Sequence, residues 1–146
     1  MKEEDRPLSD VYFFWMERAM KAQRKAKSRF FKNLGIDLTP DQWIILKRLS
    51  EVEGQSQREL SESTSKDPAS LTRSLDILEK GKLIVRQVAD RRSFTVKLTA
   101  EGKKLVTRII PEAVKYREMG INGVSENELK VFKKVLNTIN KNFSDA

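Results

Sequence analysis

The sequence contains no cysteine and no histidine, and each absence excludes a kind of chemistry. Without cysteine the chain forms no disulfide and has no thiol chemistry, which favours an intracellular, cytoplasmic protein. Zinc is usually bound by cysteine and histidine, so no metal site is expected. The lack of histidine also excludes acid–base catalysis by imidazole.

Long apolar runs are missing as well. No segment approaches the roughly 20 apolar residues that a transmembrane helix needs. The charged start of the chain, residues 1–5, is not typical of a signal peptide. We therefore expect no membrane partner. The acidic, lysine, serine and tyrosine residues have no spacing that assembles a catalytic site, so we expect neither enzyme activity nor a cofactor.

Positive charge is what the sequence has in excess. Lysine and arginine number 29 against 21 acidic residues, which gives a net charge of +8. Such a balance is typical of proteins that bind nucleic acid or an anionic surface, although it also serves solubility alone. The basic residues gather in two places: Lys21, Arg24, Lys25, Lys27, Arg29 and Lys32, and then Arg73, Lys80, Lys82, Arg86, Arg91, Arg92 and Lys97.

The two ends of the chain have helical periodicity. Apolar residues at steps of three and four predict a helix from Leu8 to about Asn33, ended by Gly35. Thr39, Pro40 and Gln42 then predict a capping box at the start of a second helix. Thr99 caps a long helix in which Pro111 should cause a kink or a break. A capping box at residues 125–128 precedes an apolar seam of Leu129, Phe132, Leu136, Ile139 and Phe143.

Between these helices, residues 56–99 predict a helix, a turn, a second helix and a hairpin. Residues 56–59 form a capping box for a helix of about two turns, and residues 63–66 form the turn. Asp67 and Pro68 begin the next helix, whose inward face is Leu71, Leu75 and Leu78. Residues 83–88 and 94–98 are two strands joined by a charged tip, residues 89–93. This order defines a winged helix-turn-helix.

Three motifs in this order resemble the multiple-antibiotic-resistance regulator (MarR) family of bacterial transcription factors. They are Leu38-Thr39-Pro40-Asp41-Gln42-Trp43-Ile44-Ile45-Leu46, then Ser56-Gln57-Arg58-Glu59-Leu60 with Leu71-Thr72-Arg73, and finally Asp90-x-Arg92 followed by Leu98-Thr99. The chain differs from the family pattern in having Lys82 where glycine is usual, Thr64 and Ser65 in a turn that often contains glycine, and a shorter wing.

The resemblance implies one mainly α-helical domain, residues 1–146, with a small β-hairpin. Residues 38–99 would form the winged helix-turn-helix, and residues 8–34 and 100–146 would form N- and C-terminal dimerisation helices. The implied function is a sequence-specific transcriptional regulator, a repressor, that binds double-stranded DNA as a homodimer at a pseudo-palindromic operator. A winged-helix module that binds protein and a non-specific nucleoid protein are the alternatives.

The expected DNA contacts lie in the helix-turn-helix. A recognition helix needs small or short polar residues near its N-terminus and a longer donor further along. Ala69, Ser70 and Thr72 supply the first, and Arg73, which can pair with guanine through two hydrogen bonds, supplies the second. Backbone amides at Ser56 and Gln57 favour a phosphate. Capping or packing alone is the alternative role for Ser56 and Thr72.

Arginines at the wing tip are the other expected DNA contacts. We expect Arg92 in the minor groove, whose negative potential suits a guanidinium, and Arg91 on phosphate or in the groove. Asp90 would orient a neighbouring arginine through a charge-assisted hydrogen bond. A solvated hairpin tip is the alternative interpretation.

The terminal helices carry more apolar surface than a winged domain of this size can cover, which favours a partner helix over an intramolecular bundle. In the family, small ligands often bind between the dimerisation helices and the winged domain. A pocket for a small aromatic effector would here be lined by Tyr12, Trp15, Phe30, Phe31 and Trp43, unless these residues only pack in the core.

Overall fold

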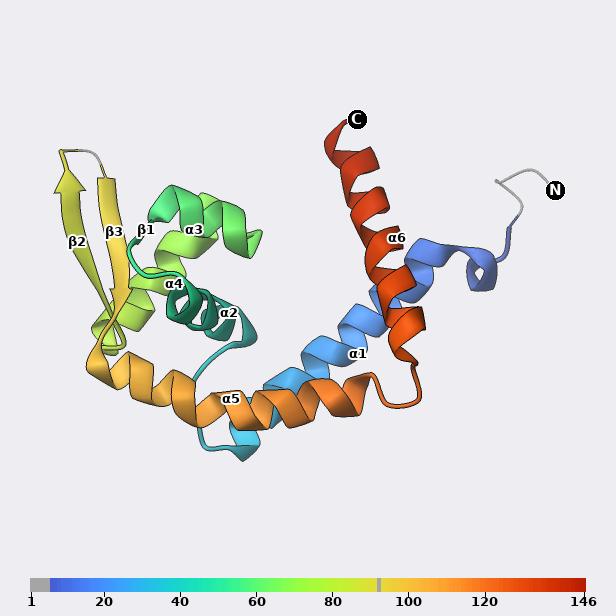
Figure 1. Ribbon diagram of the computed structural model, residues 1–146, viewed down its shortest axis with the longest axis horizontal. Coiled ribbons are helices and arrows are strands. Elements are labelled where there is room, and N and C mark those ends of the chain that lie inside the picture. The colour runs from blue at the N-terminus through green and yellow to red at the C-terminus, as the bar shows by residue number, and fades with distance from the viewer. Residues whose placement is uncertain (1–5, 92) are drawn as a thin grey trace. The chain divides into compact units, whose positions relative to one another are not determined.

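The chain is mainly helical, with one small sheet. A computed structural model describes residues 6–91 and 93–146. Its elements, in chain order, are η2 (Leu8–Asp10), α1 (Tyr12–Asn33), α2 (Pro40–Glu51), β1 (Gln55–Ser56), α3 (Gln57–Thr64), α4 (Pro68–Lys80), β2 (Ile84–Asp90), β3 (Ser93–Leu98), α5 (Ala100–Gly120) and α6 (Glu126–Ser144) (Figure 1). The predicted fold class is confirmed. Over the described residues, none of these helices combines the length and apolar character that crossing a bilayer requires.

The first helix begins later than its periodicity predicts. Residues Leu8–Asp10 form a 3-10 turn, and Val11 is extended, so α1 starts at Tyr12 rather than at Leu8. The indole Nε1 of Trp15 donates to the Ser9 carbonyl at 2.7 Å and fastens the turn to the helix. The helix ends before Gly35, whose φ of +66° is the left-handed conformation that glycine adopts without strain.

Capping at α2 is as predicted. The Thr39 hydroxyl accepts from the Gln42 amide at 3.2 Å, and the Gln42 side chain accepts from the Thr39 amide at 3.0 Å. Pro40 occupies the first helical position, where its missing amide hydrogen costs nothing. Burial of Ile45 and Leu46, both at 0% exposure, then anchors the helix in the core.

One hydrophobic core joins the helix-turn-helix, the sheet and the start of α5. Its fully enclosed side chains are Phe31, Ile45, Leu46, Leu49, Leu60, Leu71, Leu75, Leu78, Ile84, Val96 and Ile109. Gly102 lets α5 approach this core, because a Cβ there would lie 2.1 Å from the Leu83 carbonyl oxygen. The Thr99 hydroxyl caps α5 by accepting from the Gly102 amide at 3.0 Å, and it donates to the Lys82 carbonyl at 2.7 Å.

The sheet has three antiparallel strands in the order β1-β3-β2, one more than predicted. Strand β1 contains only Gln55 and Ser56, which pair with Val96 and Thr95. A strand this short has no alternation for a sequence reading to detect. The hairpin tip is also narrower than the predicted residues 89–93, because Asp90 pairs with Ser93 after an irregularity between Val88 and Asp90.

Helix α5 continues through Pro111, so of the two expected outcomes, a kink or a break, the break does not occur. Proline removes only the amide donor that the Thr107 carbonyl would use, and the helix is continuous on both sides of it. The chain divides within α5 into two compact units, one extending to Ala113 and the other comprising Val114–Ala146. Helix α6 lies in the second unit and begins with the predicted capping box of Ser125 and Glu128.

Candidate nucleic-acid interface

Ser56 is the N-cap of helix α3, and its Oγ accepts from the Glu59 amide at 3.0 Å. Only this half of the predicted capping box forms, so the prediction of a reciprocal bond is wrong. Ser56 is also the last residue of β1, and its backbone is held in the sheet opposite Thr95. The sheet therefore fixes the start of the helix-turn-helix. The Ser56 hydroxyl therefore caps α3, and a phosphate contact of the backbone amides at this position stays a prediction.

The turn between α3 and α4 contains no glycine. Ser65 adopts a left-handed conformation with φ of +54°, the conformation for which glycine is favoured. Two hydroxyls compensate: Ser61 Oγ donates to the Lys66 carbonyl, and Thr64 Oγ1 donates to the Leu60 carbonyl. The turn is thus closed by side chains of α3 rather than by backbone freedom.

The turn is also fastened to α2 by an ion pair. Lys66 Nζ lies 2.9 Å from Asp41 Oδ1, and the Lys66 side chain is only 12% exposed. Burial lowers the pKa of Lys27 on α1; in its electrostatic surroundings Asp41 favours the charged amine and Lys66 opposes it. These three charged groups come from α1, α2 and the turn. The spacing of the sequence did not indicate them, because ion pairs between distant elements have no local pattern.

Helix α4 presents a polar face outward at its N-terminal end. The Asp67 side chain accepts from the Ser70 amide at 2.9 Å, and this hydrogen bond holds the pKa of Asp67 below its ordinary value. Leu71, Leu75 and Leu78 are buried as predicted. The remaining α4 residues of the predicted site divide into exposed Ala69, Thr72 and Arg73 and half-buried Ser70.

Two side chains on this face are held by α4 itself. Arg73 Nη2 donates to Ser70 Oγ at 3.2 Å, which directs the guanidinium along the helix. Thr72 Oγ1 donates to the Pro68 carbonyl at 2.9 Å, and its contact with DNA stays a prediction. A cavity of about 410 Å³ is lined by residues of both α3 and α4. They are Gln57, Arg58, Ser61, Glu62, Pro68, Leu71 and Thr72.

The wing is the hairpin of β2 and β3, which extends beyond the core. Val88 and Phe94 pair across it and are 72% and 45% exposed. Arg91 is exposed at the tip, and Asp90 precedes it at the end of β2. Arg92, the predicted minor-groove residue, lies outside the described residues. The structure therefore places Asp90 and Arg91 together at the tip.

Arg86 joins the wing to α4. Its Nη2 atom lies 2.7 Å from Asp76 Oδ1 and 2.9 Å from Glu79 Oε1, and its amide donates to Glu79 Oε2 at 3.0 Å. Hydrogen bonds from Arg86 lower the pKa of Glu79. The sequence contained one signal: Arg86 follows Ile84 on the inward face of a strand, and a charge there needs a partner.

The aromatic residues predicted to line an effector pocket fall into two groups. Phe31 and Trp43 are buried with ring centroids 6.3 Å apart, and Phe30 lies 5.2 Å from Phe31. Tyr12 and Trp15 are 75% and 47% exposed at the opposite end of α1. Phe31 lies sixteen positions after Trp15 on α1, a rise of about 24 Å. The structure thus brings together Phe30, Phe31 and Trp43, and leaves Tyr12 and Trp15 apart from them.

A capped two-helix motif followed by a hairpin defines this chain as a winged helix-turn-helix protein. Residues 36–93 match the sequence profile of the MarR family. A MarR-family transcriptional regulator of Silicibacter pomeroyi has a similar structure, with a TM-score of 0.79 and 25% identity, covering 97% of this chain and 96% of its own. The chain therefore has the fold of MarR-family transcriptional regulators.

Two further structures are similar. A probable transcriptional regulator of Pseudomonas aeruginosa matches with a TM-score of 0.77 and 25% identity, covering 91% of this chain and 99% of its own. BpsR of Bordetella bronchiseptica, whose DNA binding is regulated by 6-hydroxynicotinic acid, matches with a TM-score of 0.78 and 22% identity, covering 97% and 98%. At that identity the likeness to BpsR concerns the fold alone.

Proposed function

We propose that this protein is a sequence-specific transcriptional repressor that binds a pseudo-palindromic operator as a homodimer. One observation carries the proposal: the N-terminal end of α4 exposes Ala69, Thr72 and Arg73, while its opposite face is buried by three leucines. A small residue lets the helix approach base edges, and arginine can make two hydrogen bonds to guanine. Repression would follow from occupation of promoter DNA.

The base contacts are assigned to α4 and the phosphate contacts to α3. Arg73 would leave Ser70 for a guanine, because a single 3.2 Å hydrogen bond between exposed groups is readily exchanged. Ser70 and Thr72 would contact base edges or the adjacent phosphates. The amides at the start of α3, near Ser56 and Gln57, would bind a phosphate through the helix dipole. Most of the affinity would then be electrostatic and salt-dependent.

Wing arginines would supply the minor-groove contact. Arg91 is exposed at the tip, and Arg92 is assigned this role from the sequence. The Arg86 bridge to Asp76 and Glu79 supports the proposal, since it links the wing to the base-reading helix. Asp90 would hold a neighbouring arginine in position rather than face the phosphates.

Dimerisation is assigned to the two ends of the chain. Helix α1 exposes Tyr12, Phe13, Trp15 and Met20, and α6 exposes Val131, Phe132, Val135 and Phe143. Apolar side chains in such number favour burial against a partner. A two-fold axis would place the two α4 helices about one helical turn of DNA apart, which is why the operator should be an inverted repeat.

An aromatic carboxylate is the proposed effector class. Phe30, Phe31 and Trp43 form an aromatic cluster, and Lys27 on the same helix as Phe30 and Phe31 is a half-buried amine that would pair with a carboxylate. BpsR, with the same fold, responds to a ligand of this chemistry. Effector binding would be detected as loss of operator affinity on titration with 6-hydroxynicotinic or salicylic acid, and an unchanged affinity would refute this part of the proposal.

Arg73→Ala is the test of the base-reading role. On a duplex selected for tight binding, the variant should lose about 1–3 kcal/mol of binding free energy. On random-sequence DNA it should lose far less. Arg117→Ala removes another exposed arginine, from α5, and serves as the control for charge alone. Equal losses on selected and random DNA would show that Arg73 contacts only the backbone.

A further inference from the structure

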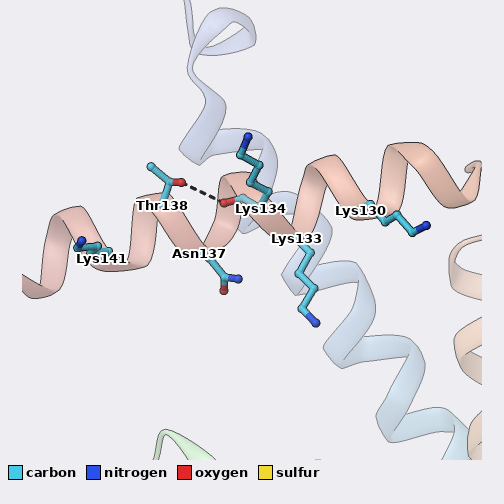
Figure 2. Close-up of a pocket in the computed structure, with 6 residues that line it drawn as sticks. All are labelled: Lys130, Lys133, Lys134, Asn137, Thr138 and Lys141. Carbon is cyan, nitrogen blue, oxygen red and sulfur yellow. Dashed lines mark hydrogen bonds between the residues drawn. The ribbon is translucent and has the colours of Figure 1, made fainter.

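Helix α6, which lies outside the winged helix-turn-helix, has a lysine-rich face. Lys130, Lys133, Lys134 and Lys141, with Asn137 and Thr138, line an open groove of about 460 Å³ (Figure 2). All of its lining residues belong to the unit Val114–Ala146. In Figure 2 the side chains of Lys133 and Asn137 point to one side of the helix and Lys134 to the other.

The lysine face is opposite the apolar face of the same helix. At about 100° per residue, the four lysines fall within an arc of about 100°. Phe132, Leu136, Ile139 and Phe143 fall on the other side, separated from the lysines. A partner that covers the apolar face therefore leaves the lysines in solvent. In a homodimer both copies of the face would remain available.

Within the described part of the chain, three of these lysines have no acidic partner. Lys130 lies 3.7 Å from Glu126, an ion pair whose side chains are 72% and 86% exposed. Lys133, Lys134 and Lys141 lie beyond salt-bridge distance of the described carboxylates. Thr138 Oγ1 donates to the Lys134 carbonyl at 3.1 Å, which leaves the hydroxyl oxygen able to accept. The face is a row of uncompensated positive charge.

We propose that the lysine face of α6 binds the phosphate backbone of a second DNA segment, independently of sequence. Lysine, asparagine and threonine are the side chains that proteins commonly place on phosphate oxygens. Lysines at 130, 134 and 141 recur along about 16 Å of helix, a length that spans several phosphates of one strand. The choice of DNA as the polyanion rests on the proposed function. The protein would then connect an operator to a neighbouring duplex.

The test is capture of a second duplex by the full-length protein. Protein is loaded on an immobilised duplex carrying the selected site, and a labelled random-sequence duplex is added at several salt concentrations. The wild type should capture it, with a salt slope steeper by about three to four than in the variant K130Q/K133Q/K134Q/K141Q. Capture by the variant should fall at least tenfold. Its affinity for the selected site should change less than twofold.

The matched control is K130R/K133R/K134R/K141R, which keeps the charge and should capture the second duplex as the wild type does. Helicity and dimer content, from circular dichroism and sedimentation, confirm that both variants fold. Equal capture by the glutamine variant would overturn the inference, and so would a wild type that captures nothing. If instead lysine-dependent capture occurs but no selected site is preferred over random DNA, the proposed function fails and the inference stands.

Discussion

At the scale of single residues, Gly102 is the glycine with the least space for a side chain. Gly102→Ala would place a Cβ 2.1 Å from the Leu83 carbonyl, so helix α5 or the start of β2 must move. We expect a loss of about 1–3 kcal/mol in the free energy of unfolding. Gly120→Ala in the same helix meets no atom within 4 Å and should cost nothing or stabilise slightly. Urea unfolding followed by circular dichroism measures both, and equal effects would contradict the close approach.

The backbone of Lys82 is in a left-handed conformation, which explains why glycine is usual at this position in the MarR family. Its φ is +61°, and a residue with a Cβ is disfavoured there by about 1–2 kcal/mol. Lys82→Gly should raise stability by about 0.5–1 kcal/mol, since glycine removes the strain but costs more chain entropy. Lys80→Gly, at the end of α4, should instead lower it by about 1 kcal/mol. Thermal melts of the two variants that shift in the same direction would refute this explanation.

At the scale of elements, the Arg86 bridge between β2 and α4 is the contact that sequence reasoning missed. Arg86→Gln removes hydrogen bonds to Glu79 and Asp76 from a side chain that is 21% exposed. We expect the free energy of unfolding to fall by about 1 kcal/mol. This is less than for a fully buried ion pair, because the two carboxylates are more exposed. Arg58→Gln breaks the Arg58–Glu62 pair, which is 89% and 68% exposed, and should change stability by less than about 0.5 kcal/mol.

The same bridge predicts a pH dependence with a definite sign. Arg86 lowers the pKa of Glu79 from its ordinary 4.5, so the folded state favours the charged carboxylate. The stabilisation is complete above pH 4.5 and is lost as pH falls through the lowered value. The stability difference between wild type and Arg86→Gln should therefore be constant near neutral pH and shrink in acid. Denaturation at a series of pH values measures it, and a difference that grows in acid would exclude the bridge as its source.

The elements also show what the sequence could and could not predict. Caps made by neighbouring residues, such as Thr39 with Gln42 and Ser125 with Glu128, were predicted because their partners are three residues apart. Strand β1 pairs with a strand distant in the sequence, and the Arg86 bridge joins a strand to a helix, so neither follows from the periodicity of a single element. Pro111 failed to break α5 because one missing amide does not outweigh the packing of Val106 and Ile109.

At the scale of the whole molecule, the apolar face of α6 predicts a homodimer. Replacing Phe132 and Ile139 with glutamine should raise the dimer dissociation constant about a hundredfold, because each protomer loses two apolar contacts. Lys134→Gln, on the opposite face of α6, should leave it unchanged. Sedimentation equilibrium measures both constants. A wild type that is monomeric at micromolar concentration would rule out this mode of assembly.

The residues expected to contact DNA differ in whether their side chains already bond within the protein. Arg73 and Arg91 are exposed as the prediction requires, whereas the hydroxyls of Ser56 and Thr72 bond locally. Sequence reasoning identified these residues from their place in the motif. It also named local capping or packing as the alternative for Ser56 and Thr72. It did not predict the hydrogen bond from Arg73 to Ser70, because that bond depends on side-chain rotamers rather than on residue type.

Selection of bound sites from a pool of randomised duplex DNA tests the central claim most directly, with affinities then measured at two salt concentrations. We predict an enriched inverted repeat with half-sites about one helical turn apart, bound at least about a thousandfold more tightly than random DNA. No enrichment, with only weak and steeply salt-dependent binding, would contradict a sequence-specific repressor and favour a nucleoid or protein-binding role.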